Sequence, residues 1–129
     1  MASPREWLLV LMLAGCGSES LPPDAPEPEA FATLAERPCP EDSYVGWEDF
    51  GGPFVYTWCT GCHSADMPEG ARGDAPLGVD FDDVEDVRAW ADRIWARAGD
   101  QNDTMPPVGG PDEEERALLG EWLACGALE

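Results

Sequence analysis

Two cysteines three positions apart stand directly before a histidine, in the stretch that runs from Cys59 through Cys62 to His63. This is the spacing at which a haem is covalently attached to a polypeptide. On one helical turn the two thiols can reach both vinyl groups of a single porphyrin, while the imidazole places a nitrogen on the iron. The stretch therefore predicts one covalently bound haem c, attached through Cys59 and Cys62, with His63 as an axial iron ligand.

The same three residues have two other interpretations. Thiolates and imidazole also suit Zn(II), but a zinc site needs a fourth ligand and usually a second Cys or His pair, which the sequence lacks. A Cys-x-x-Cys pair can also be a thioredoxin-like dithiol, which is expected in a βαβ context that is not visible here. We favour haem attachment and keep a structural or zinc-binding lipoprotein without haem as an alternative.

The second axial ligand cannot be another histidine of this chain, because His63 is its only one. Met12 lies in a segment that we expect to be removed, and Met67 follows His63 by only four residues, on the same side of the ring. Met105 stands far downstream, where two following prolines hold the chain extended. A thioether suits the iron and raises its reduction potential. We therefore predict Met105 as the second ligand, although a loop methionine is often only gap-filling.

The first 15 residues have the composition of a secretion signal. Arg5 supplies a positive start, and residues 7–13 form an apolar run that is far below the roughly 20 residues of a membrane-spanning helix. The sequence Leu-Ala-Gly that precedes Cys16 resembles the lipobox of bacterial lipoproteins, which are cut before a lipid-bearing cysteine. We predict an exported, periplasmic or outer-membrane lipoprotein anchored by acyl chains on Cys16. An ordinary signal peptide with a chance cysteine is the alternative.

Two further cysteines, Cys39 and Cys125, have no part in these assignments. In an oxidising exported compartment, an even number of remaining cysteines suggests a disulfide between them. Two unpaired thiols are the alternative.

The stretch from Cys16 to residue 38 is rich in Pro, Glu, Ala and Ser, with few apolar residues to bury. We therefore predict a lipidated cysteine followed by a disordered tether over residues 16–38, and one folded domain over residues 39–129.

Within that domain the pattern predicts three helices. The first spans residues 53–63 and has a proline in its first turn. The second spans residues 84–98; Asp82 or Asp83 caps it and Gly99 ends it. The third begins near residues 110–111, with acidic residues in its first turn. No run alternates with period two, so we predict an all-α fold with little or no sheet.

The formal net charge is −20, from 27 acidic residues against seven arginines and no lysine. Such a surface repels nucleic acid and favours partners with a basic docking surface. Plain solubility is an equally good explanation of the charge.

The order of helix, Cys-x-x-Cys-His, loop, helix, methionine loop and C-terminal helix resembles class I cytochrome c, over about residues 50–126. The setting is similar to that of small myxobacterial cytochrome c lipoproteins. The resemblance implies a small cytochrome c fold, with about three main helices wrapped around the haem. It also implies that the N- and C-terminal helices cross, bringing Gly51 or Gly52 with Phe54 against Trp122.

The family typically has Gly-Pro-x-Leu where this chain has Ala-Pro-Leu-Gly around Pro76 and Leu77. By this resemblance the carbonyl of Pro76 would accept a hydrogen bond from His63, and Leu77 would pack on the ring.

These expectations combine into a membrane-tethered, monomeric electron carrier that exchanges single electrons with redox protein partners and is not an enzyme. No second histidine can act as a base, and a six-coordinate iron leaves no open position. A haem-based redox or gas sensor, in which Met105 is labile, is the remaining alternative.

Overall fold

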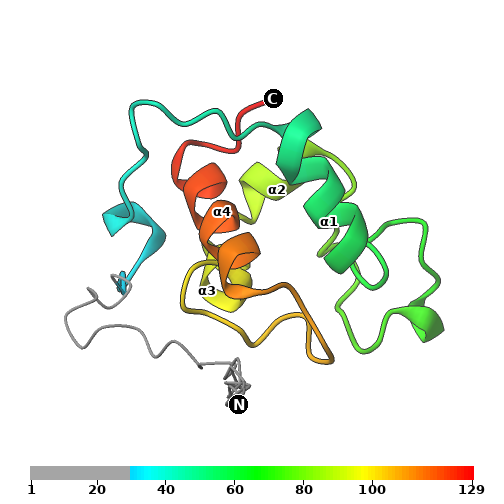
Figure 1. Cartoon of the computed structure of the whole chain (residues 1–129). Helices are drawn as coiled ribbons and strands as arrows, with labels where there is room; N and C mark the ends of the chain where they lie inside the picture. Colours follow the sequence, from blue (N-terminus) through cyan, green and yellow to red (C-terminus); the bar gives the residue numbers. More distant parts are fainter. Residues whose placement is uncertain (1–29) are drawn as a thin grey trace, which may run out of the picture.

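A computed structural model describes residues 30–129, and this part of the chain is helical without any strand, which confirms the all-α prediction. Its α-helices are α1 (Gly52–Trp58), α2 (Val84–Ala89), α3 (Ala91–Ala98) and α4 (Glu113–Ala124) (Figure 1). Long loops join α1 to α2 and α3 to α4, whereas a single residue separates α2 from α3. Shorter helical turns are η1 (Leu34–Glu36), η2 (Trp47–Gly51) and η3 (Glu69–Ala71). The predicted signal and Cys16 lie outside the described residues. Within them, no helix has the length and apolar character needed to cross a membrane.

The first helical segment begins and ends earlier than residues 53–63. A π-helical turn, η2, runs directly into α1, and Pro53 stands in the first turn of α1, where its missing N–H is harmless. After Trp58 the chain continues in turns. The N–H of Cys59 donates to the carbonyl of Val55, and the N–H of His63 donates to that of Cys59, both at 2.8 Å. The prediction of helix through His63 is therefore wrong, because the motif occupies the turn after α1.

The helix predicted over residues 84–98 is divided in two at Trp90. Asp83 caps α2 by accepting a hydrogen bond from the N–H of Asp86 at 2.9 Å, and Gly99 follows the last residue of α3, as predicted. The backbone of Trp90, with φ −111° and ψ 9°, leaves the helical region between them. The two helices therefore have separate axes although their apolar residues follow one continuous period.

The last helix, α4, has the predicted acidic start. The side chain of Asp112 accepts from the N–H of Glu115, and the Glu115 carboxylate accepts from the N–H of Asp112, which completes a capping box. Leu119 and Trp122 of this helix are fully buried.

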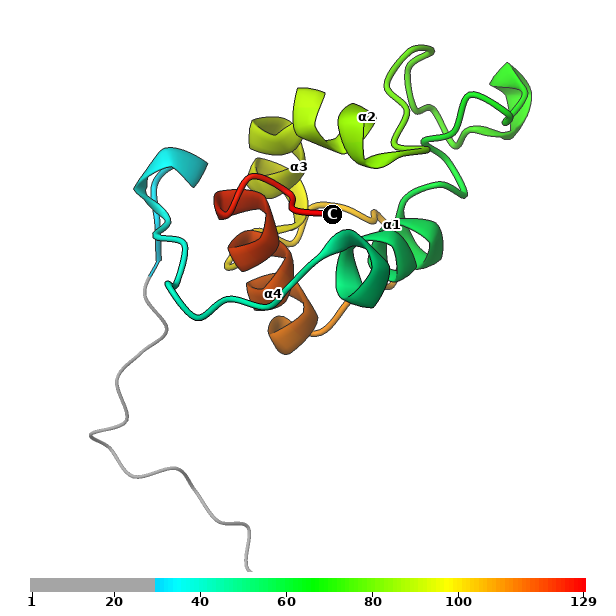
Figure 2. The same ribbon diagram turned by 90° about the horizontal axis from the view of Figure 1, so that it is seen from above.

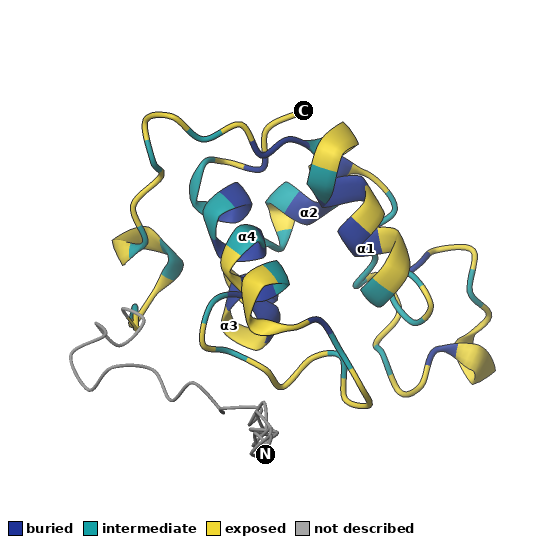
Figure 3. Ribbon diagram, viewed as in Figure 1, coloured by how far each residue is buried: buried dark blue, intermediate teal, exposed yellow. Residues whose placement is uncertain are grey.

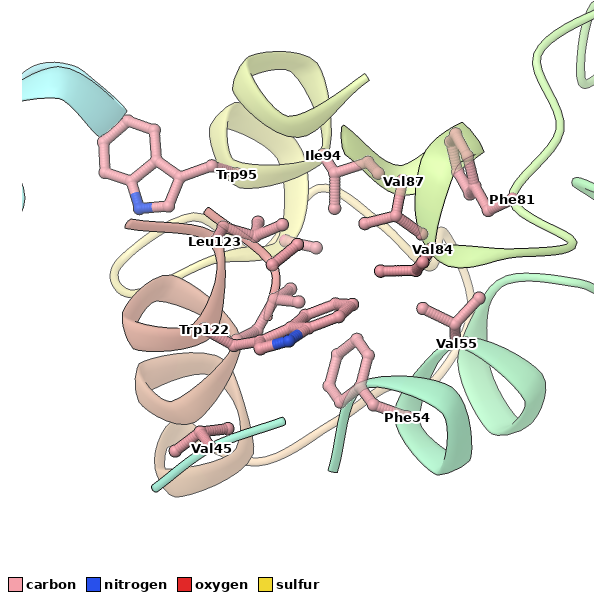
Figure 4. Packing of buried hydrophobic residues seen from close by; sticks show 13 residues of the cluster. Val45, Phe54, Val55, Phe81, Val84, Val87, Ile94, Trp95, Trp122 and Leu123 are labelled. Atoms are coloured by element: carbon pink, nitrogen blue, oxygen red, sulfur yellow. The ribbon is translucent and has the colours of Figure 1, made fainter. Parts of the chain in front are cut away.

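The core lies where the buried faces of the four α-helices meet (Figures 3 and 4). Figure 4 shows Phe54 and Val55 of α1, Val84 and Val87 of α2 and Trp122 of α4 pointing toward one another. The contact expected between Gly51 and Trp122 is present: a Cβ added to Gly51 would lie only 2.3 Å from Cζ2 of the indole. Gly51 is the last residue of η2, directly before α1, so this contact limits how closely the start of α1 can approach α4.

The tether predicted over residues 16–38 is wrong for its last part, residues 30–38. Phe31 and Leu34 pack against the core, and Arg37 forms a 3.2 Å ion pair with Asp100. In Figure 2 this segment, drawn in cyan, lies against the helical body beside α3 and α4. The two apolar residues are too few to mark a folded segment by composition, but they cover a surface that α3 and α4 leave open.

Cys39 and Cys125 are joined in a disulfide that spans 86 positions of sequence. It ties the segment before η2 to the end of α4. We expect the double change Cys39→Ser, Cys125→Ser to lower the free energy of unfolding by about 2–5 kcal/mol, because it frees a long loop in the unfolded chain. Urea titration of the variant, with reductant-treated unmodified protein as its control, measures this difference. Equal midpoints with and without reductant would contradict it.

Candidate functional site

A cavity of about 440 Å³ is formed by residues of α1, of α3 and of the loops that follow these helices. Its size falls within the range of about 300–1,000 Å³ that is typical of small-molecule and cofactor sites. Cys59, Cys62 and His63 line it from the turn after α1, and Met105 lines it from the loop between α3 and α4. Four residues that the sequence singled out for one chemistry therefore share one cavity, although Met105 is distant from the others in sequence.

The rest of the lining is mostly apolar and aromatic. One group lies on a single face around α3 with helical spacing; its members are Trp90, Arg93, Ile94, Arg97 and Ala98. Others come from α1 and from the loop after the motif, namely Phe54, Trp58, Val79 and Phe81. A largely apolar ligand with a few charged groups suits such a lining.

His63 is held in one orientation by its neighbours. Its Nδ1 lies 2.9 Å from the carbonyl oxygen of Val79, and because a carbonyl only accepts, Nδ1 carries the proton. Its ring is stacked on Phe81, with centroids 4.6 Å apart. In the neutral ring Nε2 is then the nitrogen with a free lone pair. This is the arrangement in which a histidine binds a metal through one nitrogen and donates through the other.

The expected role of Pro76 is wrong in detail. Pro76 does line the cavity, but its carbonyl accepts from Nη2 of Arg72 at 2.9 Å, and Val79 accepts the hydrogen bond of His63 instead. The prediction for Leu77 is also wrong, because its side chain is 64% exposed and is not part of the cavity wall. Leu77 follows Pro76 directly, without the intervening residue of the family pattern, and Val79 is the apolar residue that reaches the wall.

Arg72 organises the loop that supplies this acceptor. It is only 1% exposed and forms an ion pair with Asp80 at 2.6 Å. Its guanidinium donates to the backbone carbonyls of Ser64, Ala75, Pro76 and Val79. The carbonyl of Val79 thus accepts from both Arg72 and His63, so the buried arginine fixes the group that orients the histidine. Sequence reasoning missed Arg72, since arginine is seldom fully buried.

Burial raises the pKa of the Cys59 thiol from 9.0 to about 12. A reactive dithiol needs the opposite, a lowered thiol pKa. The site around Cys59 is therefore unsuited to a thioredoxin-like role. Among residues 30–129, no group of three or more His, Cys, Asp and Glu side chains is arranged to hold a metal ion.

Arg93 and Arg97 are exposed cations on the cavity wall, one helical turn apart. In the described part of the chain neither side chain forms an ion pair or a hydrogen bond, whereas Arg37, Arg72 and Arg88 each pair with a carboxylate. In a protein with a net charge of −20, two unpaired arginines beside one cavity suit a ligand with carboxylate groups.

Of the two methionines within the described residues, only Met105 lines the cavity. Met67 lies outside it, in the loop after the motif. The spacing of the apolar residues in α3 could have indicated this part of the site, because it places Arg93 and Arg97 at the edge of the apolar stripe.

No protein-family model matches the sequence, and a search of curated proteins and of solved structures finds no match either.

Proposed function

We propose that this protein is a c-type cytochrome that carries single electrons through one covalently bound haem. The observation that carries the proposal is that Cys59, Cys62, His63 and Met105 line one cavity of about 440 Å³. No other pair of cysteines is free in the described residues, because Cys39 and Cys125 are bonded to each other.

The residues present fit such a haem in three respects. Cys59 and Cys62 would form the thioether links, and His63, with Nδ1 engaged by Val79, would offer Nε2 to the iron. Met105 would supply the second axial ligand. Arg93 and Arg97 would pair with the two propionates. Bound haem supplies reversible one-electron exchange, and this chain's own residues attach, orient and shield it.

The setting of the proposal is a membrane surface outside the cytoplasm. A lipid on Cys16 and the following residues would hold the domain at that surface, and its acidic exterior would favour redox partners with a basic docking surface.

Expression with the cytochrome c maturation machinery tests this proposal. We expect a red protein that keeps its haem after denaturation and acid–acetone extraction. The double variant Cys59→Ser, Cys62→Ser should lose all extraction-resistant haem. The matched control, Cys39→Ser with Cys125→Ser, removes the other described cysteines and should retain one haem per chain.

Colourless protein from the unmodified sequence would refute the proposal. One zinc ion per chain, measured by elemental analysis of that protein, would favour the zinc-binding alternative instead.

A further inference from the structure

Arg116 of α4 is a buried cation that has no role in the proposed function as described above. Its side chain is 7% exposed, and none of the ion pairs within residues 30–129 includes it. Its Nη1 instead donates to the backbone carbonyls of Ala98, Asn102 and Met105, at 3.1, 3.0 and 3.1 Å. Burying a charge is costly unless hydrogen bonds compensate for it. The three hydrogen bonds therefore compensate for burying the guanidinium, and they also fix the positions of the three carbonyls.

The position of Arg116 explains how α4 accommodates the charge. Ala98 is the last residue of α3, and its carbonyl is one of those left without a partner at the end of a helix. The negative end of the α3 dipole favours a cation there. Arg116 thus joins α4 to the end of α3 and, through the same nitrogen, to the loop that carries Met105.

The backbone of Met105 is held at both of its polar groups. Its N–H donates to the carbonyl of Arg97 at 2.9 Å, and its own carbonyl accepts from Arg116. Farther along the loop, a Cβ added to Gly110 would lie 3.0 Å from Nη2 of Arg116. The guanidinium therefore contacts both ends of the segment from Met105 to Gly110, while Arg116 itself is not part of the cavity wall.

From this geometry we infer that Arg116 is a positioning residue that keeps Met105 in place as an axial ligand. The inference rests on the proposed function, in which Met105 binds the iron. Removing the guanidinium takes the donor from three carbonyls, one of them buried and two partly buried, and frees one of the two backbone attachments of Met105. The population of molecules in which Met105 has left the iron should then rise, and an external ligand should reach the ferrous iron faster.

The test compares carbon monoxide binding by Arg116→Gln, Arg116→Lys and the unmodified protein, all in the ferrous form. We expect Arg116→Gln to bind carbon monoxide about tenfold faster or more, since hydrogen bonds from a charged donor are the strong ones. In the oxidised form its near-infrared sulfur-to-iron band should weaken. Arg116→Lys keeps a buried cation with three donors, so its rate should lie between the two.

Arg88→Gln is the matched control. Arg88 also donates to a backbone carbonyl, that of Ala127 at 2.9 Å, but it lies outside the cavity wall and the methionine loop. Its loss should lower the stability to urea without changing the carbon monoxide rate. A purely structural role of Arg116 would give the same pattern as Arg88.

An unchanged rate and band in Arg116→Gln would overturn the inference. If that variant does not fold, an unchanged rate in Arg116→Lys would do so. Failure of the proposed function looks different: protein without haem refutes the cytochrome itself, and a Met105→Ala variant with an unchanged spectrum refutes the ligand, whatever Arg116 does.

Discussion

Met105→Ala is expected to lower the reduction potential and to remove the near-infrared sulfur-to-iron band of the oxidised protein. A thioether ligand favours ferrous iron over ferric iron more than water or hydroxide does, so its loss stabilises the oxidised state. We expect a fall on the order of 0.1 V or more, within the range of about 0.8 V that axial ligation spans. Potentiometric titration followed by absorbance measures the fall.

Met67→Ala provides the matched control for this change. Met67 is partly exposed and is not part of the cavity wall, so its replacement should leave both the potential and the band unchanged. If Met105→Ala behaved in the same way, the iron would have another second ligand and the His/Met assignment would fail. Rapid carbon monoxide binding by the unmodified ferrous protein would favour the sensor alternative, in which Met105 is labile.

In the proposed haem site, the loop that carries Met105 would also lie beside a cation of α3. The side chain is 37% exposed, and Arg97, whose carbonyl holds the N–H of Met105, also lines the cavity. Such a cation would disfavour the more positive ferric state of the proposed haem and so raise its potential further. The potential of this protein should therefore depend on both the thioether and the arginines of α3.

Capping is local, so the start of α2 and the end of α3 could be predicted, whereas the end of α1 at Trp58 could not. Asp83, one of the two predicted caps of the second helix, accepts a hydrogen bond from the N–H three residues later. Asp112, which the sequence predicts only as part of an acidic first turn, is the cap of α4. The break at Trp90 could not be predicted in the same way. The apolar residues of α2 and α3 follow one helical period, which predicts a single helix, whereas the backbone of Trp90 leaves the helical region.

The residues of the candidate site also differ in how well the sequence predicts them. Cys59, Cys62 and His63 form a contiguous motif, and Met105 could be found by eliminating the other methionines. Val79 could not, because its part in the site is played by a backbone carbonyl, which every residue has. Which carbonyl accepts from His63 depends on how the loop after the motif folds. That fold is stabilised by hydrogen bonds across the loop, such as the one from Arg72 to the carbonyl of Val79.

Arg72 and Arg116 are the clearest omissions from the sequence analysis. Arginine is usually exposed, so composition and periodicity place both on the surface. In the structure each is buried among backbone carbonyls, Arg72 beside the loop that orients His63 and Arg116 beside the loop that carries Met105. Loops without regular secondary structure leave many carbonyls unpaired, and a buried guanidinium with five donors can satisfy several at once.

The contact between Gly51, directly before α1, and Trp122 of α4 is the basis of the second prediction, which concerns stability. Gly51 has φ −57° and ψ −51°, so the backbone itself would accept alanine, and helix propensity would favour it by about 1 kcal/mol. The added Cβ would nevertheless lie 2.3 Å from Cζ2 and 2.6 Å from Cε2 of Trp122. The indole is fully buried and its Nε1 donates to the carbonyl of Leu128 at 2.9 Å, so the ring has little freedom to move away.

We therefore expect Gly51→Ala to lower the free energy of unfolding by about 3 kcal/mol, near the upper end of the overpacking range of about 1–3 kcal/mol. Gly70→Ala is the control, because a Cβ there meets nothing within 4 Å. Combining Gly51→Ala with Trp122→Phe should be less destabilising than the sum of the two single changes, since the smaller ring makes room for the methyl group. Urea titration of the four variants measures these differences. If Gly51→Ala proved as stable as Gly70→Ala, the approach of α1 to α4 would be looser than this contact requires, and it would not fix the position of the turn that carries Cys59.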